Sequence, residues 1–307
     1  MNLELVIGAF EITLPILFIL LLGGWFKHKT WISDGFVSSG NTLVFNISLP
    51  CLLYLNVSQN SISTNLNLPL IGFAIVATIV TVVVVWLFYR KQPDSGQRGV
   101  LAQCAYRGNM AIIGLALCER ALGQDILGKA AIYLAFLTIL YNLIAVVLLT
   151  TFNRKILFTI AKNPLIISIV LGLISSSSEI HPPQVVITSM AYLGKLTLPL
   201  ALLCLGASLQ WQSFKQNHRD AIAITFLKLI LIPLLTMWAA IPFGFDKTDT
   251  TLLFFMVSAP TAVAAYVMAN KMTSHGALSA EIVALSTLVS PFTIAIGYYL
   301  LKVFGMA

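Results

Sequence analysis

The sequence predicts an all-α membrane protein that crosses the bilayer ten times, and three observations lead to this expectation. Hydrophobic residues make up 58% of the 307 residues and charged residues only 9%, whereas soluble domains carry about 25% charged residues. The apolar residues gather in runs of roughly 20, the length that a helix needs to span a bilayer. The lysines and arginines lie mostly between these runs, as membrane topology requires.

Ten apolar runs qualify as expected spans. In chain order they cover residues 5–26, 35–57, 67–90, 99–120, 128–151, 163–178, 185–209, 220–241, 249–270 and 279–303. The first run contains Glu11, has no basic segment before it and is longer than the apolar core of a signal peptide, so we expect it to stay as a span.

The loop charges predict the orientation. Eleven lysines and arginines fall on one side of the expected membrane and four on the other. Because cytoplasmic loops carry the excess of basic residues, we expect both termini outside the cytoplasm. The net charge of +7 comes from these loops and not from a basic patch with interleaved aromatic residues, so we expect no nucleic acid partner.

An internal repeat is indicated by two similar segments. Residues 48–53 read SLPCLL and residues 197–202 read TLPLAL, an offset of 149. The same offset places four other spans of the first half near those of the second. We therefore expect two five-helix repeats, 1–150 and 163–307, joined by a cytoplasmic linker at 151–162. Since five is odd, the second repeat enters the membrane inverted, an arrangement common in secondary transporters.

Spans four and nine carry helix-breaking residues at corresponding places. Gly108 lies in span four between Arg107 and Asn109, and Pro260 followed by Thr261 lies in span nine. Proline removes a backbone donor and disrupts a helix. We expect two discontinuous helices that face each other at the centre of the membrane and form a binding site. The alternative is a glycine packing notch and an ordinary proline kink.

Several polar residues within the spans are candidates for binding a substrate. Asn109 offers two donors and an acceptor, and we favour it over Arg107 for direct contact. Arg107 either attracts an anion, acts as a structural counter-charge, or extends to the cytoplasmic surface. Lys195 in span seven corresponds to Asn46 in span two, and it either faces the site or the membrane surface.

Three further polar residues have two interpretations each. Lys228 in span eight could exchange protons, but we favour an extended side chain that reaches the membrane surface. Tyr141 and Asn142 in span five line a cavity or join helices by hydrogen bonds.

The histidines lie in loops without metal-ligand spacing, and there is no P-loop or GxSxG motif. The sequence thus predicts no enzyme, no metal and no cofactor.

The order of these motifs resembles the auxin efflux carrier family. The similar segments are Asn163-Pro164-Leu165-Ile166, Leu198-Pro199-Leu200, Leu205-Gly206-Ala207-Ser208-Leu209, Lys228-Leu229 with Pro233, Ala259-Pro260 and, in the first half, Arg107-Gly108-Asn109. The family lies within the bile-acid, arsenite and riboflavin transporter superfamily. The short linker is similar to that of the bacterial malate and carboxylate permeases.

This resemblance implies a ten-helix inverted repeat that works as an elevator. Spans one, two, six and seven would form a scaffold, and spans three to five and eight to ten would form a mobile transport domain. It implies that Asn109 contacts the substrate, with Thr261 at the matching place in span nine. It also implies a multi-pass protein of the bacterial cytoplasmic membrane, surrounded by lipid, and allows a homodimer.

The expected function is that of a permease for small organic anions such as mono- or dicarboxylates. One alternative is a Na⁺-coupled symporter of the bile-acid type, which needs more acidic or amide ligands than spans four and nine contain. The other is a channel or a membrane scaffold that transports nothing.

Overall fold

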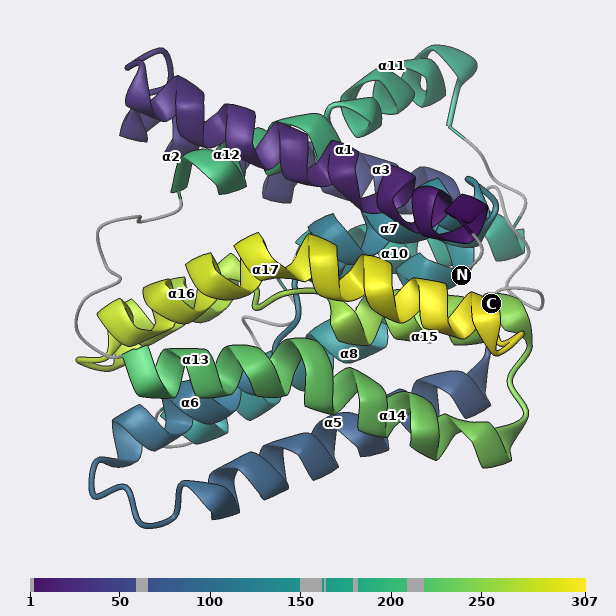
Figure 1. Cartoon of the computed structure of the whole chain (residues 1–307). Coiled ribbons are helices and arrows are strands. Elements are labelled where there is room, and N and C mark those ends of the chain that lie inside the picture. Colours follow the sequence, from purple (N-terminus) through teal and green to yellow (C-terminus); the bar gives the residue numbers. More distant parts are fainter. Residues whose placement is uncertain (1–2, 59–65, 150–161, 163, 179–181, 209–217) are drawn as a thin grey trace.

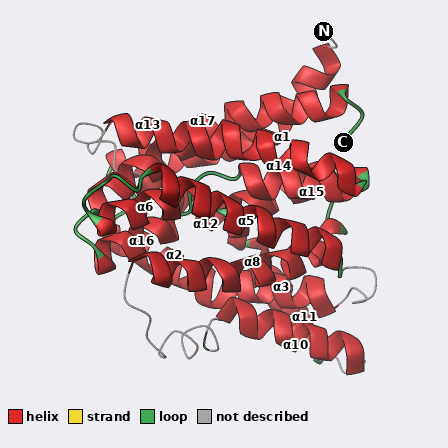
Figure 2. Cartoon of the chain, turned by 90° about the horizontal axis from the view of Figure 1, so that it is seen from below, coloured by secondary structure: helices red, strands yellow, loops and turns green. Residues whose placement is uncertain are grey.

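The computed structural model describes residues 3–58, 66–149, 162, 164–178, 182–208 and 218–307 (Figure 1). Within these ranges every regular element is a helix (Figure 2). The helices pack as two groups that meet along one boundary. The expected linker at 151–162 lies outside the described residues except for Lys162.

The first group contains the helices of expected spans one, two, six and seven. They are α1 (Leu3–His28), α2 (Asp34–Leu43), the π-helical turn η1 (Val44–Ser48), α3 (Leu49–Ser58), α10 (Pro164–Ser178), α11 (Gln184–Lys195) and α12 (Thr197–Ser208). Within it, α1 packs on α12 and α10 packs on α3.

The second group contains the remaining helices. They are α5 (Leu68–Phe88), α6 (Ser95–Tyr106), η2 (Met110–Gly114), α7 (Leu115–Leu122), α8 (Ile126–Leu149), α13 (His218–Phe226), η4 (Leu227–Leu231), α14 (Ile232–Ala240), η5 (Ile241–Phe243), α15 (Lys247–Ser258), α16 (Val263–Met272) and α17 (Gly276–Val303). This group meets the first where α17 packs on α1 and α8 packs on α3.

Six helical segments among the described residues are long and apolar enough to cross a membrane. They are Asp34–Leu55, Leu68–Phe88, Ile126–Leu149, Gln184–Ser208, Arg219–Phe243 and Gly276–Val303. Shorter apolar helices, Leu14–His28 and Pro164–Ser178, fall at expected spans one and six. Spans four and nine are each divided into two helices. The multi-pass helical architecture is therefore present, and the count of ten crossings stays a prediction.

The outer faces of the helices are suited to lipid. On α5, Val76 is 59% exposed, Val80 54% and Val84 58%. A row of exposed β-branched apolar side chains would be unfavourable in water, but it is the normal surface of a helix in hydrocarbon. The polar side chains of α5, such as Thr78, point inward instead.

Two helix crossings in the first group are alike. A Cβ atom on Gly23 of α1 would lie 2.2 Å from the Leu203 carbonyl oxygen of α12. A Cβ atom on Gly172 of α10 would lie 3.1 Å from the Tyr54 carbonyl oxygen of α3. Gly23 and Gly172 lie 149 residues apart in the sequence, and so do Tyr54 and Leu203. Both crossings thus use a glycine at corresponding positions to bring two backbones close together.

Candidate functional site

Two helix interruptions meet in the centre of the second group. The first lies between α6, which ends at Tyr106, and η2, which begins at Met110. The second lies between α15, which ends at Ser258, and α16, which begins at Val263. We call residues 107–109 together with 259–262 the crossover. Both interruptions fall where Gly108 and Pro260 predict them.

The two segments of the crossover pair with each other through their backbones. Gly108 and Thr261 form an antiparallel bridge. The Asn109 amide donates to the Pro260 carbonyl at 2.7 Å, and the Ala262 amide donates to the Arg107 carbonyl at 2.9 Å. Backbone groups that leave a helix inside a membrane must find partners within the protein, and this pairing supplies them.

Gly108 permits this close approach. A Cβ atom at this position would lie 3.2 Å from Lys228 Nζ and 3.3 Å from the Ala259 carbonyl oxygen. Such contacts are tighter than ordinary packing, so a larger residue would push the two segments apart. Pro260 contributes from the other side, because it lacks the amide that would continue α15.

Thr261 holds the crossover in place from within. It is completely buried, its hydroxyl donates to the Cys104 carbonyl at 2.8 Å, and its amide donates to Ser286 Oγ at 3.1 Å. The hydroxyl is thus committed to the end of α6. We assign Thr261 a positioning role in the crossover.

Four half-helix ends converge at the crossover and differ in charge. The ends of α6 and α15 present carbonyl groups, which carry partial negative charge. The beginnings of η2 and α16 present amide groups with partial positive charge, and neither has a side-chain cap. The carbonyl end of α15 receives the ammonium of Lys228, while the uncapped amide ends are suited to an anion.

Arg107 is the basic residue at the end of α6. Only 8% of it is exposed, so it does not extend to the membrane surface. Its guanidinium donates to the Tyr141 carbonyl at 3.2 Å and to Asn142 Oδ1 at 2.9 Å. Tyr141 and Asn142, both on α8, therefore hold Arg107 in place. Since these acceptors are neutral, they leave the positive charge of Arg107 intact.

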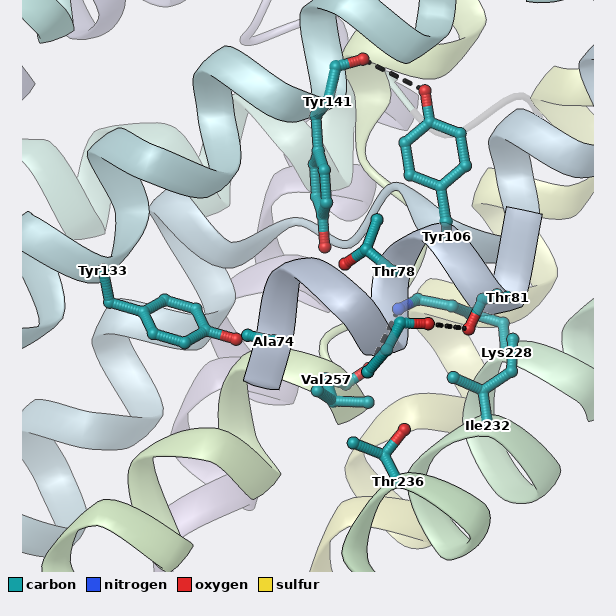
Figure 3. A pocket seen from close by; sticks show the side chains of 11 residues that line it. Ala74, Thr78, Thr81, Tyr106, Tyr133, Tyr141, Lys228, Ile232, Thr236 and Val257 are labelled. Carbon is teal, nitrogen blue, oxygen red and sulfur yellow. Dashed lines mark hydrogen bonds between the residues drawn. The ribbon is translucent and has the colours of Figure 1, made fainter. Parts of the chain in front are cut away.

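Lys228 is the basic residue at the end of α15. The expectation that it reaches the membrane surface is wrong, because it is 1% exposed and its ammonium donates to the Val257 carbonyl at 2.9 Å (Figure 3). Its position on η4 points the side chain into the second group, and the partial negative charge of the carbonyl end favours a cation there. Sequence hydropathy does not reveal which face of a span is buried.

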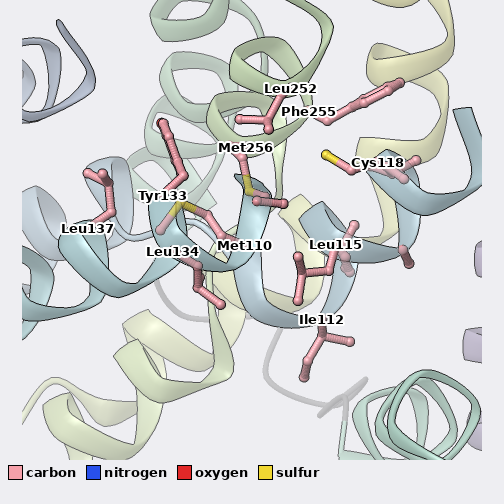
Figure 4. Packing of buried hydrophobic residues seen from close by; sticks show 14 of the residues in the cluster. Met110, Ile112, Leu115, Cys118, Tyr133, Leu134, Leu137, Leu252, Phe255 and Met256 are labelled. Carbon is pink, nitrogen blue, oxygen red and sulfur yellow. The ribbon is translucent and has the colours of Figure 1, made fainter. Parts of the chain in front are cut away.

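The half helix formed by η2 and α7 is anchored by apolar packing (Figure 4). Met110 and Leu115 pack with Tyr133 and Leu134 of α8 and with Met256 of α15 in one buried cluster. This packing fixes the direction of the helix that begins after Asn109. The open amide end of η2 is therefore held toward the crossover.

Asn109 has unfilled hydrogen-bonding capacity within the crossover. It is 5% exposed, and its amide nitrogen Nδ2 is buried without a hydrogen-bond partner among the described residues. A buried donor without an acceptor costs about 1–3 kcal/mol. An oxygen of a ligand would remove this cost.

Asn46 and Lys195 do not belong to the crossover. Both are exposed and lie on the first group, and Asn46 Nδ2 donates to the Thr42 carbonyl at 2.9 Å. The buried polar residues near them are Ser48 and Thr197, which are again 149 residues apart. Both are completely buried and have hydroxyls without a partner among the described residues. Sequence reasoning did not single them out, although each directly precedes a Leu-Pro pair.

A largely buried ion pair away from the crossover was also not predicted from the sequence. Lys129 Nζ lies 2.6 Å from Asp249 Oδ1, and Asn67 Nδ2 donates to Asp249 Oδ2 at 2.5 Å. These residues join the beginnings of α8, α15 and α5. Their separation in the sequence gives no signal for the contact. No group of three or more His, Cys, Asp or Glu side chains in the described part of the chain could hold a metal.

The comparisons with known proteins agree with this architecture. The chain matches the family model described as membrane transport protein over residues 9–156 and 148–298. An uncharacterized transporter of Methanothermobacter thermautotrophicus is 23% identical over 288 residues, which cover 92% of this chain and 95% of that protein. The uncharacterized transporter YfdV of Escherichia coli is 21% identical over 299 residues, which cover 90% and 92%. The chain therefore belongs to the auxin efflux carrier family of membrane transport proteins.

Proposed function

We propose that this transporter is a secondary carrier of small organic anions such as mono- or dicarboxylates. The observation that carries the proposal is Asn109, whose buried amide nitrogen has no partner in the described structure. It lies at the open amide end of η2, and α16 begins on the paired segment. An oxygen of a carboxylate would accept from Asn109 and interact favourably with both half-helix beginnings.

Charge supports an anion over a cation as the substrate. Arg107 and Lys228 are both buried beside the crossover, and neither takes part in the ion pairs among the described residues. Two positive charges in a region of low dielectric attract an anion strongly. The same charges repel a Na⁺ ion, which counts against the symporter of the bile-acid type.

We further propose that the carrier is a ten-span inverted repeat with an elevator mechanism. The paired glycine crossings at Gly23 and Gly172 support the repeat. In both Figure 1 and Figure 2 the beginning of α1 and the end of α17 lie at the same end of the bundle, as an even number of crossings requires. The first group would be the fixed scaffold, and the second would move with the crossover.

Transport by purified protein in liposomes tests the carrier and its site. Wild-type protein should show saturable uptake and counterflow of a labelled mono- or dicarboxylate without Na⁺, which a channel or inert scaffold cannot produce. Asn109→Asp keeps the side-chain shape but replaces two donors by a negative charge. We expect it to lower uptake at least about 100-fold, because it both removes a bond to a charged ligand and repels it.

Asn41→Asp on α2 is the matched control, since it makes the same chemical change outside the crossover. It should retain wild-type uptake. Carboxylate counterflow by Asn109→Asp at the wild-type rate would exclude Asn109 as the binding residue.

A further inference from the structure

A second polar site lies next to the crossover, around the ammonium group of Lys228. An ammonium has three donors and no acceptor, and the Val257 carbonyl takes one of them. None of the ion pairs among the described residues includes Lys228. A cation buried without a counter-charge is strongly unfavourable, so the arrangement calls for an anion.

Burial opposes the charged form of this lysine, and the end of α15 favours it. Val257 belongs to the last turn of α15, where the partial negative charge of the helix end stabilises a cation. Gly108 leaves room beside Nζ, since a Cβ atom there would lie only 3.2 Å away. The ammonium is thus fixed in position with two donors left for other partners.

A small pocket opens beside this ammonium (Figure 3). Its volume is about 20 Å³, and hydroxyl groups enter it from three helices. Thr78 comes from α5, Tyr133 and Tyr141 come from α8, and Thr236 comes from α14. Hydroxyls are good donors to an anion because their hydrogens rotate toward it.

The size of the pocket selects the kind of anion. A cavity of about 10–15 Å³ holds a single water molecule, so this pocket accepts one particle slightly larger than water. Asn109 and Thr261 do not line the pocket, whereas Tyr141, whose carbonyl accepts from Arg107, does; the pocket thus adjoins the proposed substrate site.

We propose that this pocket binds a monoatomic anion of the size of chloride. Lys228 would supply the charge, and the hydroxyls of Thr78 and Thr236 would contribute to the coordination. With this site occupied, Lys228 is neutralised and Arg107 carries the attraction for the organic anion; with the site empty, both charges act on it.

The test measures halide binding to the purified transporter without any organic substrate. The melting temperature is followed in sodium chloride or bromide against sodium methanesulfonate, which carries no carboxylate, at equal ionic strength. A ligand that binds only the folded state raises the melting temperature with its concentration, so chloride and bromide should both raise it saturably. A crystal grown in bromide should show an anomalous peak within hydrogen-bonding distance of Lys228 Nζ.

Two variants and a control make the test specific. Lys228→Met removes the charge and should abolish the halide-dependent shift. Thr236→Val should weaken bromide binding about tenfold, as expected when a hydrogen bond to a charged group is lost. Thr225→Val removes a buried hydroxyl from α13, outside the pocket, and should leave the shift unchanged.

A melting temperature that is equal in halide and methanesulfonate would overturn the proposal. So would a halide-dependent shift that survives Lys228→Met, or a bromide peak elsewhere with none at Lys228. These outcomes do not depend on carboxylate transport, so they are separate from the Asn109 experiment.

Discussion

At the scale of single residues, the crossover separates side chains that hold it from a side chain that is free to bind. Arg107, Thr261 and Lys228 each donate to a carbonyl group of a neighbouring element. Asn109 alone among the predicted crossover side chains has a buried polar atom without a partner in the described structure. Asn109 thus supplies a free donor within the crossover, and Ser258 Oγ at the end of α15 is a second buried polar atom without a partner in the described structure.

The charge of Arg107 can be tested without removing the residue. Asn142→Asp keeps the acceptor 2.9 Å from the guanidinium but supplies a negative charge that neutralises it. We expect the melting temperature to stay within a few degrees of wild type and the KM for a carboxylate to rise about tenfold, because attraction for the anion is weakened. An unchanged KM would assign Arg107 a purely structural role.

The sequence allowed part of this site to be predicted. Gly108 and Pro260 break helices through their backbone chemistry, which is local, so both interruptions could be placed. The partners of Arg107 and Lys228 depend on which faces of α8 and η4 turn inward. A span that is apolar on every face has no amphipathic pattern that would predict its buried face. For the same reason Lys228 was expected at the membrane surface, and the Lys129–Asp249 pair was not expected.

At the scale of helices, glycine contacts determine how the first group packs. A Cβ atom on Gly206 of α12 would lie 1.9 Å from the Leu20 carbonyl oxygen of α1. Backbone cannot move aside as a flexible side chain can, so the helices would have to separate. The apolar segments that contain α1 and α12 could be predicted from hydropathy, but this crossing depends on contacts between distant residues.

Gly206→Ala should therefore destabilise the protein by about 1–3 kcal/mol, the usual cost of overpacking. Gly72→Ala is the control, because nothing lies within 4 Å of a Cβ atom there and alanine favours a helix by about 1 kcal/mol over glycine. Thermal unfolding in detergent measures both. An equal response of the two variants would show that the α1–α12 contact does not limit stability.

The loops of the second group are joined by polar contacts outside the apolar segments. His275 Nε2 lies 2.8 Å from Asp94 Oδ2, between the loop before α6 and the beginning of α17. This hydrogen bond, together with those from the Gln97 and Gly96 amides, lowers the pKa of the Asp94 carboxyl below its ordinary value. The carboxylate thus caps α6 and connects it to α17 in its charged form.

At the scale of the whole molecule, two helix groups share one boundary, and the crossover lies within the second. The multi-pass helical class follows from composition, because apolar runs dominate the chain. The division into a scaffold and a transport domain, which the family resemblance implies, stays a prediction, because α1 of the first group also packs extensively on α17 of the second. If the second group moves as one body, the crossover and its charges move with it.

The central claim is that a carboxylate binds at the crossover through Asn109, and its most direct test is a structure of the transporter with a bound brominated carboxylate. We expect the carboxylate within hydrogen-bonding distance of Asn109 Nδ2, facing the beginnings of η2 and α16, with the bromine peak nearby. A carboxylate bound elsewhere, with the Asn109 amide still without a partner, would contradict the account.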